Sequence, residues 1–208
     1  MPNKDPKDSA AHAQADAFLL RELSEHRRAF EATAGMLAAP FAEVLTLFEH
    51  SVRRGGKLLW FGNGGSAADA QHIAAELIIR YRTTRAPIAA LALSTDTSAL
   101  TACANDFGFE AVFERQIEGL GRAGDVAVGI STSGRSENVL RGLRRAKSMG
   151  LHTVGLTGGT GGSMRDACDA LILVPSSVTA RIQEMHILVG HMLCKALEER
   201  LGLVGDDS

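Results

Sequence analysis

Five short hydrophobic runs constrain the fold of this chain more than any other feature. Segments whose apolar residues recur with a period near 3.6 separate the runs, as expected for helices. A strand that is apolar without alternation is covered on both faces, which is typical of parallel sheets. The sequence therefore predicts an α/β fold: a doubly wound five-stranded parallel sheet flanked by helices. The five runs are LLWF at 58–61, IAALAL at 88–93, VAVGI at 126–130, TVGL at 153–156 and ALILV at 170–174.

A helical arm is predicted before the first strand. From about Asp16 to Arg54 apolar residues recur mostly at spacings of three, four and seven, and Pro40 is expected to divide the segment into two helices or a kinked pair. We expect a polar, disordered tail at 1–14, N-terminal helices at 15–55 and the sheet domain at 56–203. Because the arm has no element of its own to cover, it must pack on that domain or on other subunits.

Charge and hydropathy exclude several classes of partner. The formal net charge is −2, so no basic excess indicates nucleic-acid binding. No stretch approaches the ~20 apolar residues that span a bilayer, and the N-terminus lacks a signal-peptide pattern. We therefore expect a cytoplasmic protein with no membrane partner. Cys103, Cys168 and Cys194 lack CxxC spacing, which argues against disulfides and structural zinc.

Three predicted strands are each followed by a loop of small residues and then by a helix. The loops are GNGGSAADA, STSGRSENV and TGGTGGS. In an open α/β sheet such loops meet at the carboxyl edge, where ligands bind. The second loop carries the hydroxyls of Ser131, Thr132, Ser133 and Ser136 beside a helix N-terminus, which favours a sugar phosphate. A single loop of this kind is more often ordinary helix capping, and it is the three loops in register that favour phosphate binding; TGGTGGS alone is equally typical of a mobile connector.

Nucleotide binding is not supported by these loops. GNGG does not match GxGxxG, and the sequence contains no GxxxxGK[ST] motif.

Two pairs of polar residues on predicted helices suit a metal ion. His72 and Glu76 are four residues apart and share a helix face, while Gln183 and His191 interrupt an apolar helix predicted from about Thr179 to Leu201. Imidazole nitrogens with carboxylate and amide oxygens suit zinc. A surface contact within one helix is the alternative for the first pair. The sequence does not establish that the two helices converge. His186, three residues after Gln183, is a competing candidate that we do not expect to be a ligand.

Together these motifs resemble the phosphoheptose isomerases, which are built on the sugar-isomerase (SIS) domain. The resemblance rests on FGNGGSAADAQHIAAE, LSTDTSALTACANDFGFEAVFERQIEGLGRAGDV, ISTSGRSENV and TARIQEMHILVGHML, in this order and over nearly the whole chain. It implies conversion of sedoheptulose 7-phosphate to D-glycero-D-manno-heptose 7-phosphate for surface-glycan synthesis such as lipopolysaccharide. It also implies a homotetramer with active sites between subunits.

The resemblance also implies particular residues. Glu76 is expected to be the base and His191 the acid, and one zinc ion per subunit is expected at His72, Glu76, Gln183 and His191. Some family members carry Asp where Ala180 stands, which puts one sugar contact in doubt. Substrate contacts are expected from Asn63, Gly64, Gly65, Glu76, Asn105, Asp106, Ser131, Thr132, Ser133, Ser136 and Gln183.

Two alternatives remain at this point. A metal-assisted hydride shift would use the same residues in place of proton transfer through an enediolate. A non-catalytic SIS-domain regulator that binds the replication initiator would have the same fold. Relatives with that regulatory role lack the acidic residue and the imidazole at the positions of Glu76 and His191, and this chain has both.

Overall fold

The predicted parallel sheet is present. The computed structural model describes residues 6–204 and contains a five-stranded sheet in the order β2-β1-β3-β4-β5, with every pairing parallel. All five runs contain a strand, although only three residues of the second run pair at the sheet edge. The strands are β1 Leu58–Gly62, β2 Ala90–Ala92, β3 Val126–Ser131, β4 His152–Gly158 and β5 Ala170–Val174.

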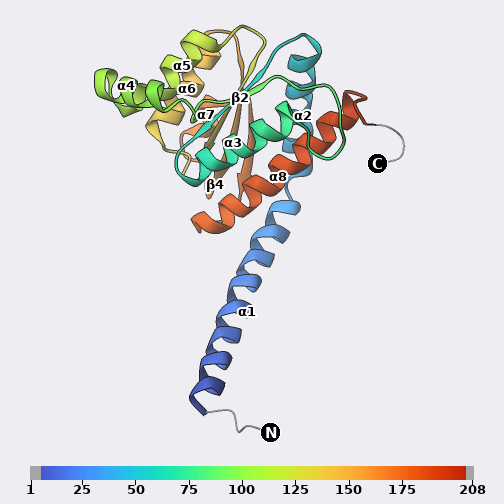
Figure 1. Ribbon diagram of the computed structural model, residues 1–208, viewed down its shortest axis with the longest axis vertical. Coiled ribbons are helices and arrows are strands. Elements are labelled where there is room, and N and C mark those ends of the chain that lie inside the picture. Colours follow the sequence, from blue (N-terminus) through green and yellow to red (C-terminus); the bar gives the residue numbers. More distant parts are fainter. Residues whose placement is uncertain (1–5, 205–208) are drawn as a thin grey trace.

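Helices cover both faces of the sheet, which explains the continuous hydrophobicity of its strands (Figure 1). Side chains of β1 alternate between two buried clusters. Trp60 meets Phe48 edge-on on one face, at 5.7 Å between ring centroids, and Phe61 lies 5.2 Å from Phe113 on the other. The first face carries α2 Ala38–Arg53, α3 Gly65–Ile78 and α8 Thr179–Arg200, and the second α4 Thr97–Phe107, the short 3₁₀ turn Phe109–Ala111, α5 Val112–Leu120, α6 Glu137–Ser148 and α7 Met164–Ala167.

The arm α1, Pro6–Ala34, extends away from the sheet domain (Figure 1). The helix begins earlier than predicted, so residues 6–14 of the expected tail are helical and residues 1–5 lie outside the described part. Proline suits a first helical position and alanine has the highest helix propensity, which explains the early start. Its large apolar side chains remain exposed along much of its length: Phe18, Leu19, Leu20, Leu23 and Phe30.

The break between the first two helices was placed wrongly at Pro40. It falls at 35–37, and Pro40 lies in the first turn of α2. Backbone N–H groups in a first turn have no intrahelical acceptor, so proline is tolerated there.

No single helix in residues 6–204 is both long and apolar enough to cross a bilayer. The pair Gln14–Ala34 and Ala38–Arg53 has the length and composition together, but it is bent by 70°.

Candidate active site

Helices α3 and α8 lie side by side and run in the same direction. Gln183 contacts Gly65 near the start of both helices, Gly190 packs against Ile73, and Glu198 accepts a hydrogen bond from the backbone just after α3. A Cβ at Gly190 would lie 2.6 Å from Cδ1 of Ile73, so glycine allows the two helices to approach closely at this level.

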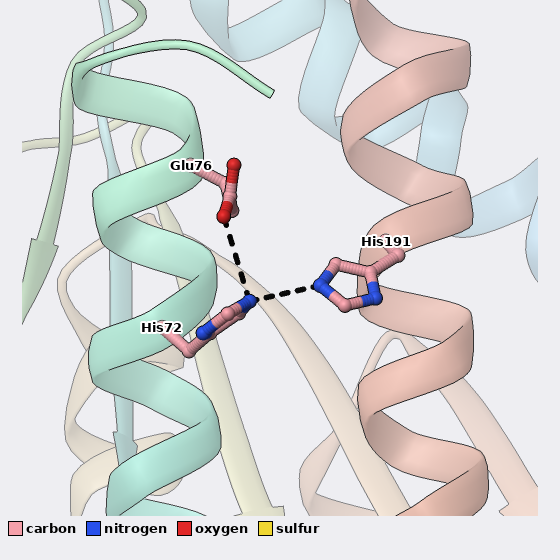
Figure 2. A group of neighbouring side chains, drawn as sticks. All are labelled: His72, Glu76 and His191. Atoms are coloured by element: carbon pink, nitrogen blue, oxygen red, sulfur yellow. Dashed lines mark hydrogen bonds and ion pairs between the residues drawn. The ribbon is translucent and has the colours of Figure 1, made fainter. Parts of the chain in front are cut away.

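This approach brings together His72 and Glu76 of α3 and His191 of α8 (Figure 2). Nε2 of His72 lies 2.8 Å from Nε2 of His191 and 3.5 Å from Oε1 of Glu76. One ligand atom from each side chain can be chosen so that all three lie within 4.8 Å of one another. The convergence that the sequence left open is therefore present, and the pair on α3 is more than a contact within one helix.

The donor set of the cluster fits a zinc-class ion. Two imidazole nitrogens and a carboxylate oxygen are the ligands of many zinc sites that keep an open coordination position. The pKa of His191 is lowered by burial and by the neighbouring His72, while Glu76 acts in the opposite direction. A lowered pKa favours neutral imidazole, which is the form that binds metal.

Gln183 is not part of this cluster within one chain. An ideal Cβ at Gly65 would lie 2.3 Å from Nε2 of Gln183, so the amide occupies the space beside that glycine. It precedes His191 by eight residues, or about 12 Å along a helix. Its role as the fourth metal ligand therefore stays a prediction.

The hydroxyl-rich loop lies between β3 and α6, where the sequence placed it. Oγ of Ser131 lies 2.9 Å from Oγ of Ser136 and 3.4 Å from Oγ of Ser133, which accepts a hydrogen bond from the backbone N–H of Arg135. Ser136 occupies the N-cap position of α6, yet its side chain makes no capping bond. The free N–H groups of that helix end are available to an anion.

A pocket of about 220 Å³ adjoins this loop. It extends between the ends of β3, β4 and β5, and the TGGTGGS segment supplies part of its wall, so that segment is more than a connector. The hydroxyl residues of the lining are Thr132, Ser133, Thr160, Ser176, Ser177 and Thr179.

The GNGG loop is tied to the hydroxyl-rich loop. Asn63 and Asn138 exchange two side-chain hydrogen bonds of 2.8 Å each, and Asn138 is the second residue of α6. Gly64 has a φ of 55°, a conformation that favours glycine, and Gly65 leaves the room that Gln183 fills. Sequence reasoning missed Asn138, because an asparagine in a first helical turn gives no signal of its distant partner.

Asn105 and Asp106 lie apart from the cluster. Both are exposed near the C-terminal end of α4, and Asn105 donates a hydrogen bond of 2.7 Å to Asp106. Their contact with substrate stays a prediction.

Asp69 is a functional candidate that the sequence reasoning missed. It lies one turn before His72, and its Oδ2 is buried without a hydrogen-bond partner among the described residues. Burial raises its pKa to about 6, against the opposing effect of His72. A carboxyl group that titrates near neutrality beside such a cluster is typical of sites that move protons. Its spacing of three from His72 was the available signal.

His186, in contrast to His191, is buried in the core and contacts the backbone of β4. Its Nε2 donates to the carbonyl oxygen of Thr157 at 3.2 Å, and burial lowers its pKa to about 4. The ring is neutral and lies outside the cluster.

Comparison with known proteins defines the class first: the SIS domain family matches residues 23–158. A phosphoheptose isomerase of Paramagnetospirillum magneticum is 57% identical over 181 residues, covering 87% of this chain and 94% of the relative. One from Nitratiruptor sp. is 53% identical, covering 86% and 96%. The structure of the phosphoheptose isomerase from Neisseria gonorrhoeae superposes with a TM-score of 0.84 at 43% identity, covering 89% of this chain and 99% of that one. The chain belongs to the phosphoheptose isomerase family.

Proposed function

We propose that the protein converts sedoheptulose 7-phosphate to D-glycero-D-manno-heptose 7-phosphate, an aldose–ketose isomerisation. The observation that carries the proposal is the convergence of His72, Glu76 and His191 in a chain that belongs to the phosphoheptose isomerases. The regulatory alternative receives no support, because both residues whose absence would favour it lie in the cluster.

Proton transfer assigns a separate task to each side chain. Glu76 removes the proton from C1 of the open-chain ketose, exchanges it with solvent and delivers a proton to C2, while His191 moves a proton between the two oxygens. The Glu76 side chain is 24% exposed, so it is open to a ligand from one side. Since a carboxylate bound tightly to a metal is a weaker base, we expect its metal contact to be loose or exchanged for substrate.

One zinc ion per subunit is part of the proposal. His72, Glu76 and His191 would hold it, and Gln183 would supply the fourth ligand once its amide leaves the space beside Gly65. When bound, zinc supplies positive charge to oxygen atoms that become negative during the reaction. Metal analysis of protein purified without chelators should find close to one ion per chain.

The hydroxyl-rich loop is proposed to bind the phosphate group. Ser131, Thr132, Ser133 and Ser136 offer hydroxyl donors beside the N-terminus of α6, whose dipole favours an anion. Asn63, Gly64 and Gly65 would line the sugar at the same edge of the sheet.

A homotetramer with active sites between subunits would complete this arrangement. It is supported by the exposed apolar side chains of α1 and by an apolar groove of about 380 Å³ between α1, α2 and α8.

We also propose that the reaction takes place in the cytoplasm, because a charged sugar phosphate does not cross a bilayer unaided. The product would enter the synthesis of activated heptose for lipopolysaccharide or related glycans.

The deciding experiment is incubation with sedoheptulose 7-phosphate in deuterated water, with product analysis by NMR and mass spectrometry. We expect the heptose 7-phosphate carrying solvent deuterium at C2. A product without deuterium would indicate a hydride shift instead, and no product from folded, zinc-loaded protein would reject the isomerase assignment.

A further inference from the structure

The segment between α3 and β2 returns over the His72, Glu76 and His191 cluster. Its residue Tyr81 places its ring on the imidazole of His191, with 5.4 Å between ring centroids and 28° between the planes. His72 meets the same imidazole edge-on, with centroids 5.0 Å apart. The ring of His191 therefore contacts two other aromatic rings.

A buried ion pair fastens this segment to both helices. Nε of Arg85 lies 2.7 Å from Oε1 of Glu198, and each side chain is only 1% exposed. The same Glu198 oxygen accepts the backbone N–H of Tyr81 at 3.2 Å. The Arg85 guanidinium also donates to the carbonyl oxygens of Glu76 at 2.9 Å and Leu77 at 2.7 Å, at the C-terminal end of α3.

Burial of such a pair adds little net stability, because removing both charges from water offsets most of their attraction. The Arg85–Glu198 pair does, however, fix positions. Arg85 donates to the carbonyls at the C-terminal end of α3, and Glu198, two helical turns after His191 on α8, holds the backbone N–H of Tyr81.

By holding Tyr81, the Arg85–Glu198 pair affects the orientation of the His191 ring. A metal-binding histidine is normally oriented by a hydrogen bond through its second ring nitrogen. Within residues 6–204, the hydrogen bond that the His191 ring makes is through Nε2, with His72. Stacking against Tyr81 therefore takes the place of the usual orienting hydrogen bond.

We propose that Tyr81, held in place by the Arg85–Glu198 pair, is a positioning residue that fixes the His191 imidazole with Nε2 toward His72 and Glu76. This inference rests on the proposed function for its kinetic consequence, but not for its effect on metal affinity. It depends on the ring of Tyr81 and not on the hydroxyl.

The test compares Tyr81→Leu with Tyr81→Phe, and with Thr84→Ala as a control in the same segment, since Thr84 is exposed. Zinc affinity of the metal-free protein is measured by competition with a chromophoric chelator, alongside kcat, KM and the urea midpoint. We expect Tyr81→Leu to weaken zinc binding about 10- to 100-fold and to lower kcat by a similar factor with little change in KM. Tyr81→Phe and Thr84→Ala should stay within about threefold of the wild type in zinc affinity, since each keeps the stacked ring.

A second variant separates positioning from stability. The double substitution Arg85→Met with Glu198→Leu removes the pair without leaving a lone buried charge, so the protein should stay folded, with a urea midpoint lowered only by the hydrogen bonds lost at the backbone of Glu76, Leu77 and Tyr81. Zinc affinity should nevertheless fall as it does in Tyr81→Leu.

Unchanged zinc affinity in Tyr81→Leu would overturn the inference, as would a Tyr81→Phe variant as impaired as Tyr81→Leu. A wild-type protein that binds zinc but does not isomerise the sugar phosphate would reject the proposed function alone, because the zinc titration would still test Tyr81.

Discussion

At the scale of single residues, position decides which polar side chains act. His191 and His186 lie five residues apart on α8, yet one joins the cluster and the other is buried against the carbonyl of Thr157. Both have a pKa below the usual value for histidine, and burial is the main cause in each. Only the one with a second imidazole and a carboxylate beside it can bind a metal.

Substitution of Glu76 tests the base. Glu76→Gln keeps the shape of the side chain but removes its proton-accepting charge, so kcat should fall about 10²- to 10⁴-fold. The urea midpoint should not change, because the fold uses the backbone carbonyl of Glu76 and not its partly exposed carboxylate. Glu43→Gln, at an exposed site on α2, serves as the control. Near-normal turnover would remove Glu76 from the mechanism.

The lowered pKa of His186 should make the free energy of unfolding depend on pH. Its pKa is about 4 in the fold, against 6.5 for the exposed side chain, so the unfolded state takes up a proton first as the pH falls. Stability from this group is present above pH 6.5 and is lost between pH 6.5 and 4, by about 3 kcal/mol. In His186→Gln the urea-derived free energy of unfolding should fall less over this range. Equal slopes for both proteins would contradict the assignment.

At the scale of elements, the packing of α3 against α8 creates the site. The sequence predicted both helices, and it predicted that His72 and Glu76 share a face. It could not predict the distance between the helices, because that depends on Gly190 and Ile73, far apart in the chain. It also suggested Gln183, eight residues before His191 on α8, as a further ligand, and that role stays a prediction.

Gly190→Ala tests this packing. The added Cβ would lie 2.6 Å from Cδ1 of Ile73, a buried core side chain, so either Ile73 shifts against its neighbours or α8 moves away from α3. We expect a loss of about 1–3 kcal/mol in the free energy of unfolding. Weaker zinc binding should follow, since the helix shift separates His191 from His72.

The pairing with Ile73 supplies the controls. Gly190→Ala combined with Ile73→Ala removes Cδ1 and Cγ1, the two atoms that lie 2.6 and 2.8 Å from the added Cβ, and should restore most of the zinc affinity. Gly119→Ala, at a helical glycine with open space around its Cβ, should be neutral or slightly stabilising. Equal effects at the two glycines would mean that the close approach of the helices is not what Gly190 provides.

At the scale of the whole molecule, the contacts within one chain do not account for the apolar side chains of the arm α1, which they leave exposed. Helix α1 extends from the domain with apolar side chains in solvent (Figure 1). Exposed apolar surface of this kind marks an interaction site.

Charges on this arm should disrupt assembly. The wild type should elute with a mass four times the 22.0 kDa of the chain in size-exclusion chromatography with light scattering. Leu19→Glu with Leu23→Glu places two charges on one face of α1, one turn apart, and should give smaller species with reduced activity. Arg28→Glu, an exposed change of charge on the same helix, should remain a tetramer. A double variant that stays tetrameric would show that α1 lies outside the interface.

The sequence by itself determined the elements: five strands whose continuous hydrophobicity requires cover on both faces, and the helices between them, although not the start of α1 or its break from α2. It also determined the chemistry of single faces, such as the pair His72 and Glu76, because periodicity and capping are local. Only the tertiary structure decided that His191 meets this pair and that Tyr81 lies over His191. The contact of His191 depends on side-chain packing between helices more than a hundred residues apart in the sequence. The position of Tyr81 depends on the segment after α3, which the ion pair between Arg85 and Glu198 holds against α8.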